Sequence, residues 1–164
     1  MLLYLLRHGI AEDHGTRATD AERELTELGR ERVRDVLAAA KRMKLATPDL
    51  VIASPLIRAQ QTAKIAMEVF AKNASFETSD LITPMSEVTE TMALIADRAQ
   101  KFDRVMLVGH DPHLSILGSA LLGSSSIVIE MKKAALAKFE ISRFDVPRMR
   151  GYLTVLLPPR VGSL

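Results

Sequence analysis

An arginine, a histidine or both follow each of three separated apolar runs in the sequence. Arg7 and His8 follow the first run, and Arg58 comes shortly after the second. His110 follows the third run. Arginine binds phosphate or carboxylate oxygens through forked, charge-assisted hydrogen bonds, and a neutral imidazole can attack phosphorus. Brought together, these side chains would perform phosphoryl transfer through a phosphohistidine on the chain itself.

The three apolar runs have the composition of buried parallel strands, because they are nearly continuous rather than alternating. The strands expected in chain order are residues 2–6, 50–53, 105–108, 134–141 and 152–157, with a weaker candidate at 75–78. Helical spacing predicts helices over residues 27–44, from Ser54-Pro55 onward, over 85–100 and over 112–123. This alternation predicts an α/β three-layer sandwich: a mostly parallel central sheet with helices on both faces. The length favours a single domain, residues 1–164.

Ligands of open α/β sheets bind beyond the carboxyl ends of the strands. We therefore expect the two arginines and two histidines to meet at one edge of the sheet. A helix beginning near Ser54 would direct free N–H groups to the same edge and favour an anion there. Nearby cations disfavour imidazolium, so the arginines would help to keep a histidine nucleophile neutral. Arginine and histidine donors could also meet the charge that a metal would otherwise neutralise.

Each signal also has a plain structural interpretation. An Arg-His-Gly tripeptide can arise by chance, and Ser54-Pro55 is a common way to begin a helix. Arg58 could be a solvated surface residue, and His110 could be a hydrogen-bonded structural histidine. The conjunction of three signals, each at a predicted strand end, favours a functional site.

Four sequence blocks resemble the histidine phosphatase superfamily, which includes the phosphoglycerate mutases, and most closely its short bacterial SixA-type phosphohistidine phosphatases. The blocks are Arg7-His8-Gly9, Arg23-Glu24-Leu25-Thr26-Glu27-Leu28-Gly29, Ser54-Pro55-Leu56-Ile57-Arg58-Ala59-Gln60-Gln61-Thr62 and Val108-Gly109-His110. They occur in the family's order and span most of the chain. The resemblance implies a phosphoglycerate mutase-like fold. The stretch between Thr62 and Val105 is too short for the helical cap of larger relatives.

The resemblance also implies roles for individual residues. His8 would be the nucleophile that becomes phosphorylated. The residues expected to bind the phosphoryl group or the substrate are Arg7, Gly9, Arg23, Arg58 and His110. Arg23 is equally well explained as a charge near a helix start, and Glu24 stands where proline is common in the family.

The general acid that protonates the leaving group has two candidates. Glu87 follows the predicted segment before the third helix and is slightly favoured; Asp111 directly follows His110. Glu87 could equally occupy the first turn of that helix, and Asp111 could simply precede Pro112 as a cap. A phosphohistidine substrate would need a strong acid less, because imidazole departs more readily than an alkoxide.

Composition excludes several other classes of protein. The 22 Lys+Arg against 20 Asp+Glu leave a net charge of +2, too little for a nucleic-acid binder. The chain has no cysteine, which fits a reducing cytoplasm and excludes thiolate chemistry. The longest uncharged run, residues 114–129, is too short and too interrupted to cross a membrane. His110 and His113 have a metal-ligand spacing without matching carboxylates, so we expect no metal and no cofactor.

The predicted function is a metal-independent phosphatase that acts on phosphohistidine of a phosphotransfer or signalling protein. An uncapped, open pocket would admit a side chain projecting from another protein but would hold a small metabolite poorly. One alternative is a broad phosphomonoesterase acting on small phosphorylated molecules. The other is a non-catalytic phospho-recognition module, which would have little use for His8.

Overall fold

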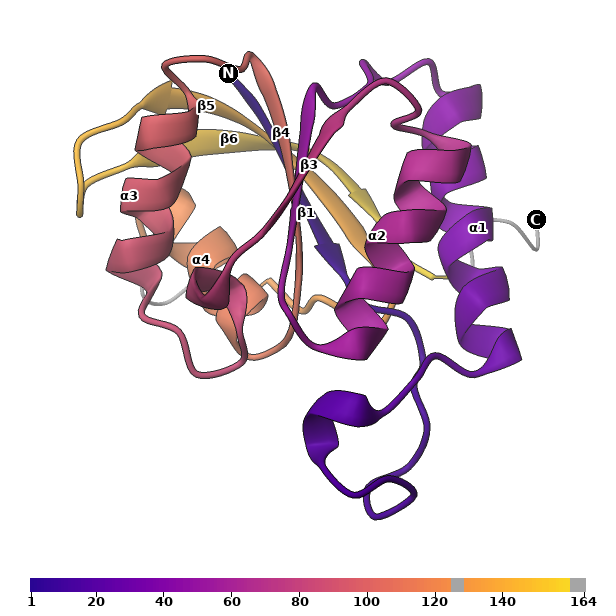
Figure 1. Cartoon of the computed structure of the whole chain (residues 1–164). Coiled ribbons are helices and arrows are strands. Elements are labelled where there is room, and N and C mark those ends of the chain that lie inside the picture. Colours follow the sequence, from indigo (N-terminus) through magenta and orange to yellow (C-terminus); the bar gives the residue numbers. More distant parts are fainter. Residues whose placement is uncertain (125–128, 160–164) are drawn as a thin grey trace.

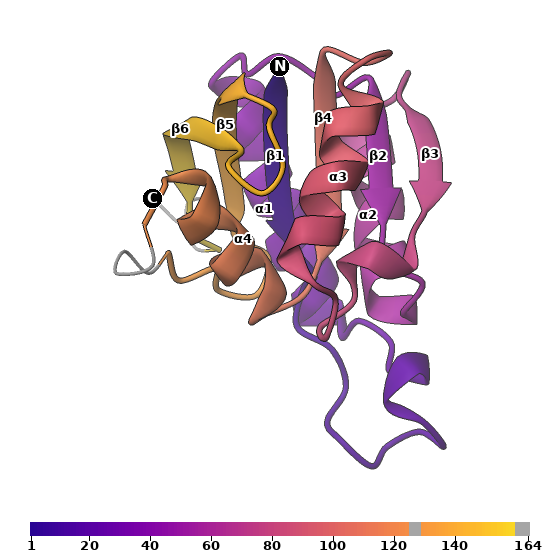
Figure 2. The ribbon, with the colours of Figure 1, turned by 90° about the vertical axis from the view of Figure 1, so that its left-hand side faces the viewer.

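One mixed sheet forms the centre of the molecule. The structure, a computed structural model, describes residues 1–124 and 129–159. Within these residues six strands pair in the order β3-β2-β4-β1-β5-β6, seen face-on in Figure 2. Their bounds are β1 (Leu2–Arg7), β2 (Leu50–Ala53), β3 (Ser75–Thr78), β4 (Arg104–Gly109), β5 (Leu136–Arg143) and β6 (Arg150–Leu157). Strands β1 to β4 pair in parallel, whereas β5 pairs antiparallel with β1 and β6 pairs antiparallel with β5, which confirms the mostly parallel sheet.

Helices cover both faces of this sheet. They are α1 (Glu27–Arg42), α2 (Ile57–Val69), α3 (Val88–Arg98) and α4 (His113–Leu121). Figure 1 shows α1 and α2 on one face and α3 and α4 on the other. The buried apolar residues divide into two clusters in the same way, one on each side of the sheet. The fold is therefore the predicted three-layer α/β sandwich.

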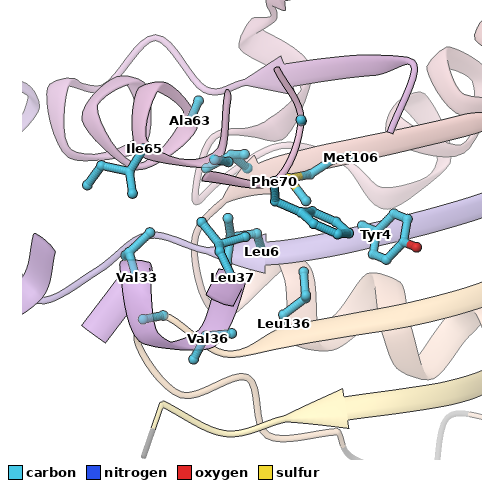
Figure 3. Packing of buried hydrophobic residues seen from close by; sticks show 14 of the residues in the cluster. Tyr4, Leu6, Val33, Val36, Leu37, Ala63, Ile65, Phe70, Met106 and Leu136 are labelled. Carbon is cyan, nitrogen blue, oxygen red and sulfur yellow. The ribbon is translucent and has the colours of Figure 1, made fainter. Parts of the chain in front are cut away.

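The central strand β1 contributes to both layers of the core. Successive side chains of a strand point to opposite faces, so Tyr4 and Leu6 join the cluster beneath α1 and α2 while Leu3 and Leu5 join the other. Figure 3 shows Tyr4 packed beside Phe70, which follows α2, with ring centroids 5.9 Å apart. Burial on both faces fixes the strand, and with it the position of the residues that follow its carboxyl end.

Two helix starts differ from the sequence prediction, and one agrees with it. Helix α1 begins at Glu27 as predicted, and Thr26 caps it because its side chain accepts a hydrogen bond from the N–H of Gly29. The N-cap of α2 is Leu56, not the predicted Ser54. Helix α3 begins at Val88 rather than near residue 85, because the Ser86 hydroxyl holds a turn by accepting from the N–H of Thr83.

The polar, charge-rich residues between β1 and α1 form a loop at the carboxyl end of β1. An isolated bridge between Ala11 and Leu25 closes its base, and the short 3₁₀ helix η1 (Asp20–Glu22) lies within it. Figures 1 and 2 show the loop projecting beyond the body of the sandwich.

No helix in the described ranges is both long and apolar enough to span a bilayer. Within the uncharged run discussed above, residues 125–128 lie outside the described residues.

Candidate active site

The carboxyl ends of β1, β4 and β2 lie side by side. The N–H of His8 donates to the Gly109 carbonyl at 3.0 Å, and the N–H of Ser54 donates to the Val108 carbonyl at 3.0 Å. Parallel pairing thus brings the residues after these three strands to one edge, as the strand-end rule predicts. The imidazole rings of His8 and His110 consequently lie next to each other, with centroids 4.9 Å apart and planes tilted by 54°.

A polar cavity of about 360 Å³ opens at this edge. Its lining residues are Arg7, His8, Ala11, Glu12, Asp13, His14, Asp20, Arg23, Arg58, Pro84, His110, Asp111 and Lys133. The structure therefore brings the four strand-end residues singled out in the sequence to one cavity, and adds Arg23 and Asp111. Much of the remaining lining comes from the loop after β1.

His8 is held in the form that can attack phosphorus. Its Nδ1 lies 2.7 Å from the Gly9 carbonyl, and because a carbonyl only accepts, Nδ1 carries the proton. The lone pair of the neutral ring is then on Nε2. Burial, followed by the charges of His110, Arg58 and Arg7, lowers the pKa of His8 to about 2. The ring is therefore neutral at physiological pH.

His110 is fixed by a residue that the sequence interpretation assigned elsewhere. Its Nε2 lies 2.8 Å from the Ser54 hydroxyl, and both side chains are buried. Ser54 is not the N-cap of α2, but its hydroxyl contacts both the imidazole of the cavity and the N–H of the N-cap residue Leu56, the latter at 3.4 Å. Burial, and after it the charge of Arg58, lowers the pKa of His110 to about 3. The Ser-Pro signal marked the correct position in the chain but did not reveal the contact with His110.

Three nitrogens of the cavity residues lack a partner. Among residues 1–124 and 129–159, the buried side-chain nitrogen and oxygen atoms without a hydrogen bond are Arg7 Nε, Arg58 Nε and His110 Nδ1. Buried polar groups are nearly always paired, because leaving one unpaired costs roughly 1–3 kcal/mol. That all three belong to residues lining one cavity beside His8 indicates a site built to receive an oxyanion.

Arg7 and Asp111 form an ion pair at the cavity. Arg7 Nη1 donates to Asp111 Oδ2 at 2.8 Å and to the Met131 carbonyl at 2.6 Å. The other carboxylate oxygen of Asp111 accepts from the Ser115 hydroxyl at 2.7 Å. Asp111 thus uses both oxygens as acceptors and holds the guanidinium of Arg7 in place.

Asp20 was not singled out in the sequence, yet it contacts two cavity arginines. Its carboxylate accepts from Arg58 Nη2 at 2.9 Å and from Arg23 Nε at 2.8 Å, and its carbonyl accepts from Arg58 Nη1 at 2.7 Å. Burial alone would raise the pKa of Asp20, but the hydrogen bonds from Arg23 and Arg58 lower it overall. The capping spacing of Thr19 and Glu22 signals the short helix but not where it docks.

Two predicted site residues lie outside the cavity lining. Gly9 donates its N–H to the Thr62 hydroxyl, and a Cβ at Gly9 would lie 2.7 Å from the Gly29 carbonyl. Gly9 therefore serves close packing against α1 rather than substrate contact. Glu87, the favoured acid, is the N-cap of α3, where its charge acts on His113. Its assignment as the general acid gains no support from this position.

His113 is a structural residue outside the cavity lining. It is buried, with Nε2 2.9 Å from the Thr91 hydroxyl and Nδ1 3.0 Å from the Ser86 carbonyl. Both ring nitrogens are therefore occupied. Across the described ranges, no group of three or more His, Cys, Asp or Glu side chains is arranged to hold a metal ion.

Comparison with known proteins identifies relatives over most of the chain. An uncharacterised protein of Picosynechococcus sp. is 31% identical over 140 residues, covering 83% of this chain and 82% of the relative. The solved structure of the protein histidine phosphatase SixA complexed with tungstate superposes with a TM-score of 0.84 at 23% identity, covering 97% of both chains. The SixA structure from Agrobacterium tumefaciens gives a TM-score of 0.81 at 24% identity, covering 96% of this chain and 97% of that one.

These structural similarities agree with the phosphoglycerate mutase-like fold expected for this chain. A mycobacterial glucosyl-3-phosphoglycerate phosphatase has the same fold at 17% identity, with a TM-score of 0.67 and coverage of 94% of this chain and 97% of its own. Residues 3–83, which include Arg7, His8 and Arg58, match the model of the histidine phosphatase superfamily, branch 1. The chain belongs to the histidine phosphatase superfamily.

Proposed function

We propose that the chain is a metal-independent phosphatase that hydrolyses phosphohistidine on a phosphotransfer or signalling protein, through a phosphohistidine intermediate on His8. The observation that carries this proposal is the set of unpartnered buried nitrogens at Arg7, Arg58 and His110, beside a neutral imidazole. These groups suit the three equatorial oxygens of a transferring phosphoryl group.

The reaction has two steps. In the first, the Nε2 lone pair of His8 forms a bond to phosphorus while the P–N bond of the substrate breaks. The leaving imidazole departs neutral when its other ring nitrogen carries a proton. In the second, water attacks the phosphorus, the bond to His8 Nε2 breaks, and inorganic phosphate leaves. In both steps the Arg7 and Arg58 guanidiniums stabilise the charge on the phosphoryl oxygens.

The carboxylates of the cavity favour a substrate with a good leaving group. Glu12 accepts two hydrogen bonds from Arg17, which together with other contacts lower the pKa of Glu12 to about 2. Asp20 is likewise bound to Arg23 and Arg58, and these contacts lower its pKa overall. Carboxylates held by cations remain ionised and donate protons poorly. This suits cleavage of a P–N bond more than release of an alkoxide.

The surroundings of the cavity favour a protein substrate. Between α2 and β4 the chain forms only β3, a short 3₁₀ helix (Asp80–Ile82) and α3, so no helical cap is inserted there. A phosphorylated side chain projecting from another protein could therefore reach the cavity. The fold likeness to protein histidine phosphatase SixA is consistent with this substrate class.

Trapping of the intermediate tests the proposal directly. We expect a ³²P-phosphorylated histidine phosphotransfer domain to release phosphate and to transfer an acid-labile, base-stable label to the chain, with EDTA present throughout. His8→Ala should lose the label and at least roughly a thousandfold in kcat. His14→Ala, which removes an imidazole with an exposed side chain, should still form the label. Turnover without the label, or substantial activity of His8→Ala, would refute the nucleophile assignment.

A phosphomonoesterase acting on small molecules is the second candidate, favoured by the position of Asp111 in the cavity lining. If Asp111 holds Arg7, Asp111→Asn should slow p-nitrophenyl phosphate and an alkyl phosphate by similar factors. Glu87→Gln, away from the cavity, should change neither rate more than about twofold. Selective loss of alkyl phosphate hydrolysis, on the order of a hundredfold, would instead make Asp111 the general acid and favour the second candidate.

A further inference from the structure

A second, larger cavity adjoins the polar cavity lined by His8 and His110, which is called the catalytic cavity from here on. Its volume is about 760 Å³, roughly twice that of the catalytic cavity. Arg7 and Lys133 line both, so the two spaces meet at these side chains. A phosphoryl group and the ring that carries it would occupy the smaller cavity and leave the larger one open to whatever is attached to them.

The larger cavity is cationic on one part of its wall. Besides the shared side chains, Arg32 of α1, Lys132 and Glu130 line it. Arg32 lies 3.7 Å from Asp35 and Arg7 lies 2.8 Å from Asp111, so both arginines are already paired with carboxylates. Lys132 lies 4.0 Å from Glu130, while Lys133 has no ion pair within the described part of the chain. Lys133, and Lys132 with its long contact to Glu130, are therefore the groups that a ligand carrying carboxylates would meet here.

The remaining wall is apolar. Ile10, Leu28 and the prolines that follow β6 line it, and Leu28 is 48% exposed. An exposed leucine and adjoining prolines within a cationic rim are typical of a surface that contacts another protein, where apolar contact is surrounded by charged pairs. A small phosphorylated metabolite held in the catalytic cavity would leave this wall uncovered.

We propose that this second cavity, lined by Arg32, Lys132, Lys133 and Leu28, binds acidic and apolar side chains that flank the phosphohistidine of the substrate protein. The inference rests on the proposed function and extends it from the phosphoryl group to the sequence around it. The cavity selects substrates by charge and leaves the chemistry at His8 unchanged.

Two matched peptides test the proposal. Both carry a single histidine phosphorylated with phosphoramidate; glutamates and a leucine flank it in one, and serines flank it in the other. The wild-type chain should hydrolyse the acidic peptide with a kcat/KM at least tenfold higher. Raising the salt concentration from 50 to 300 mM should reduce this preference, because exposed charges are screened.

The variant Lys132→Glu identifies the surface responsible. Lys132 lines only the second cavity and its side chain is 61% exposed, so the substitution should leave the fold intact. It should lower the ratio of kcat/KM for the acidic peptide to kcat/KM for the serine peptide below about twofold. Hydrolysis of the serine peptide itself should stay within twofold of wild type. Lys41→Glu makes the same charge change in the last turn of α1 and should keep the preference.

The possible failures are distinguishable. Equal wild-type turnover of the two peptides, or a preference that survives Lys132→Glu, would overturn the second cavity as a subsite and leave the phosphohistidine function standing. Hydrolysis of p-nitrophenyl phosphate with no hydrolysis of either peptide would overturn both proposals together.

Discussion

At the level of single residues, the proposed mechanism depends on which ring nitrogens carry protons. The Gly9 carbonyl determines the tautomer of His8 because it can only accept a hydrogen bond. His110 can donate to a phosphoryl oxygen from Nδ1 only if its Nε2 accepts a hydrogen bond, and the Ser54 hydroxyl, 2.8 Å away, is the group that can donate it. Ser54 is therefore a positioning residue that acts through His110.

Removing the Ser54 hydroxyl should separate this role from simple stability. We expect Ser54→Ala to lower kcat about tenfold to a hundredfold, because His110 Nδ1 would no longer be held as a donor. Nitrogen NMR of the imidazoles should show a protonated Nδ1 on His110 in the wild type and a tautomer mixture in the variant. Ser54→Thr, which keeps the hydroxyl, should retain more activity. A tautomer unchanged in Ser54→Ala would contradict this role.

At the level of elements, the loop after β1 supplies an internal anion to the catalytic cavity. Through η1 it places the Asp20 carboxylate on Arg58 and Arg23, where the charge of an incoming phosphate must approach it. The negative charges of the Asp20 carboxylate and of a phosphate dianion bound to the same arginines repel each other, so the carboxylate opposes binding of the phosphate. The same loop closes its own base through the pairing of Ala11 and Leu25.

Neutralising this carboxylate should strengthen anion binding. Asp20→Asn keeps an oxygen for the arginines but removes the negative charge, so the competitive inhibition constant of inorganic phosphate should fall about fivefold. Asp145→Asn, which removes an equal charge from the connection between β5 and β6, should leave it unchanged. Weaker phosphate binding by Asp20→Asn would mean that the carboxylate chiefly positions Arg58.

The same elements show what sequence reasoning can and cannot reach. Strand positions and the convergence of His8 and His110 follow from apolar runs and parallel pairing, which are local patterns with a fixed geometric consequence. The contact of Asp20 with Arg58 depends on the path of an irregular loop, which no periodicity specifies. The contact of Ser54 with His110 could not be predicted, because a hydroxyl before a helix can bond to the helix start, to a neighbouring side chain or, as here, to both, and only the tertiary structure decides.

At the level of the whole molecule, buried histidines lower the stability of the fold under acidic conditions. His8, His110 and His113 are all buried, and burial is the largest cause that lowers the pKa of each. In the unfolded chain these histidines titrate near the ordinary value of about 6.5. As the pH falls below that value, the unfolded chain binds protons that the folded chain does not. Stability is therefore fully present above about pH 6.5 and is lost as the pH falls further.

Acidification from pH 7.5 to 5.5 should consequently lower the free energy of unfolding. The folded pKa values of His8 and His110, about 2 and about 3, keep both rings neutral over this range. Each should contribute a loss of about 1 kcal/mol, measured by urea unfolding at constant ionic strength. The double variant His8→Asn/His110→Asn cannot take up these protons when unfolded, so its stability should depend less on pH. A wild-type stability that is constant or rises on acidification would show that these imidazoles are already protonated in the folded chain, which is incompatible with a neutral nucleophile.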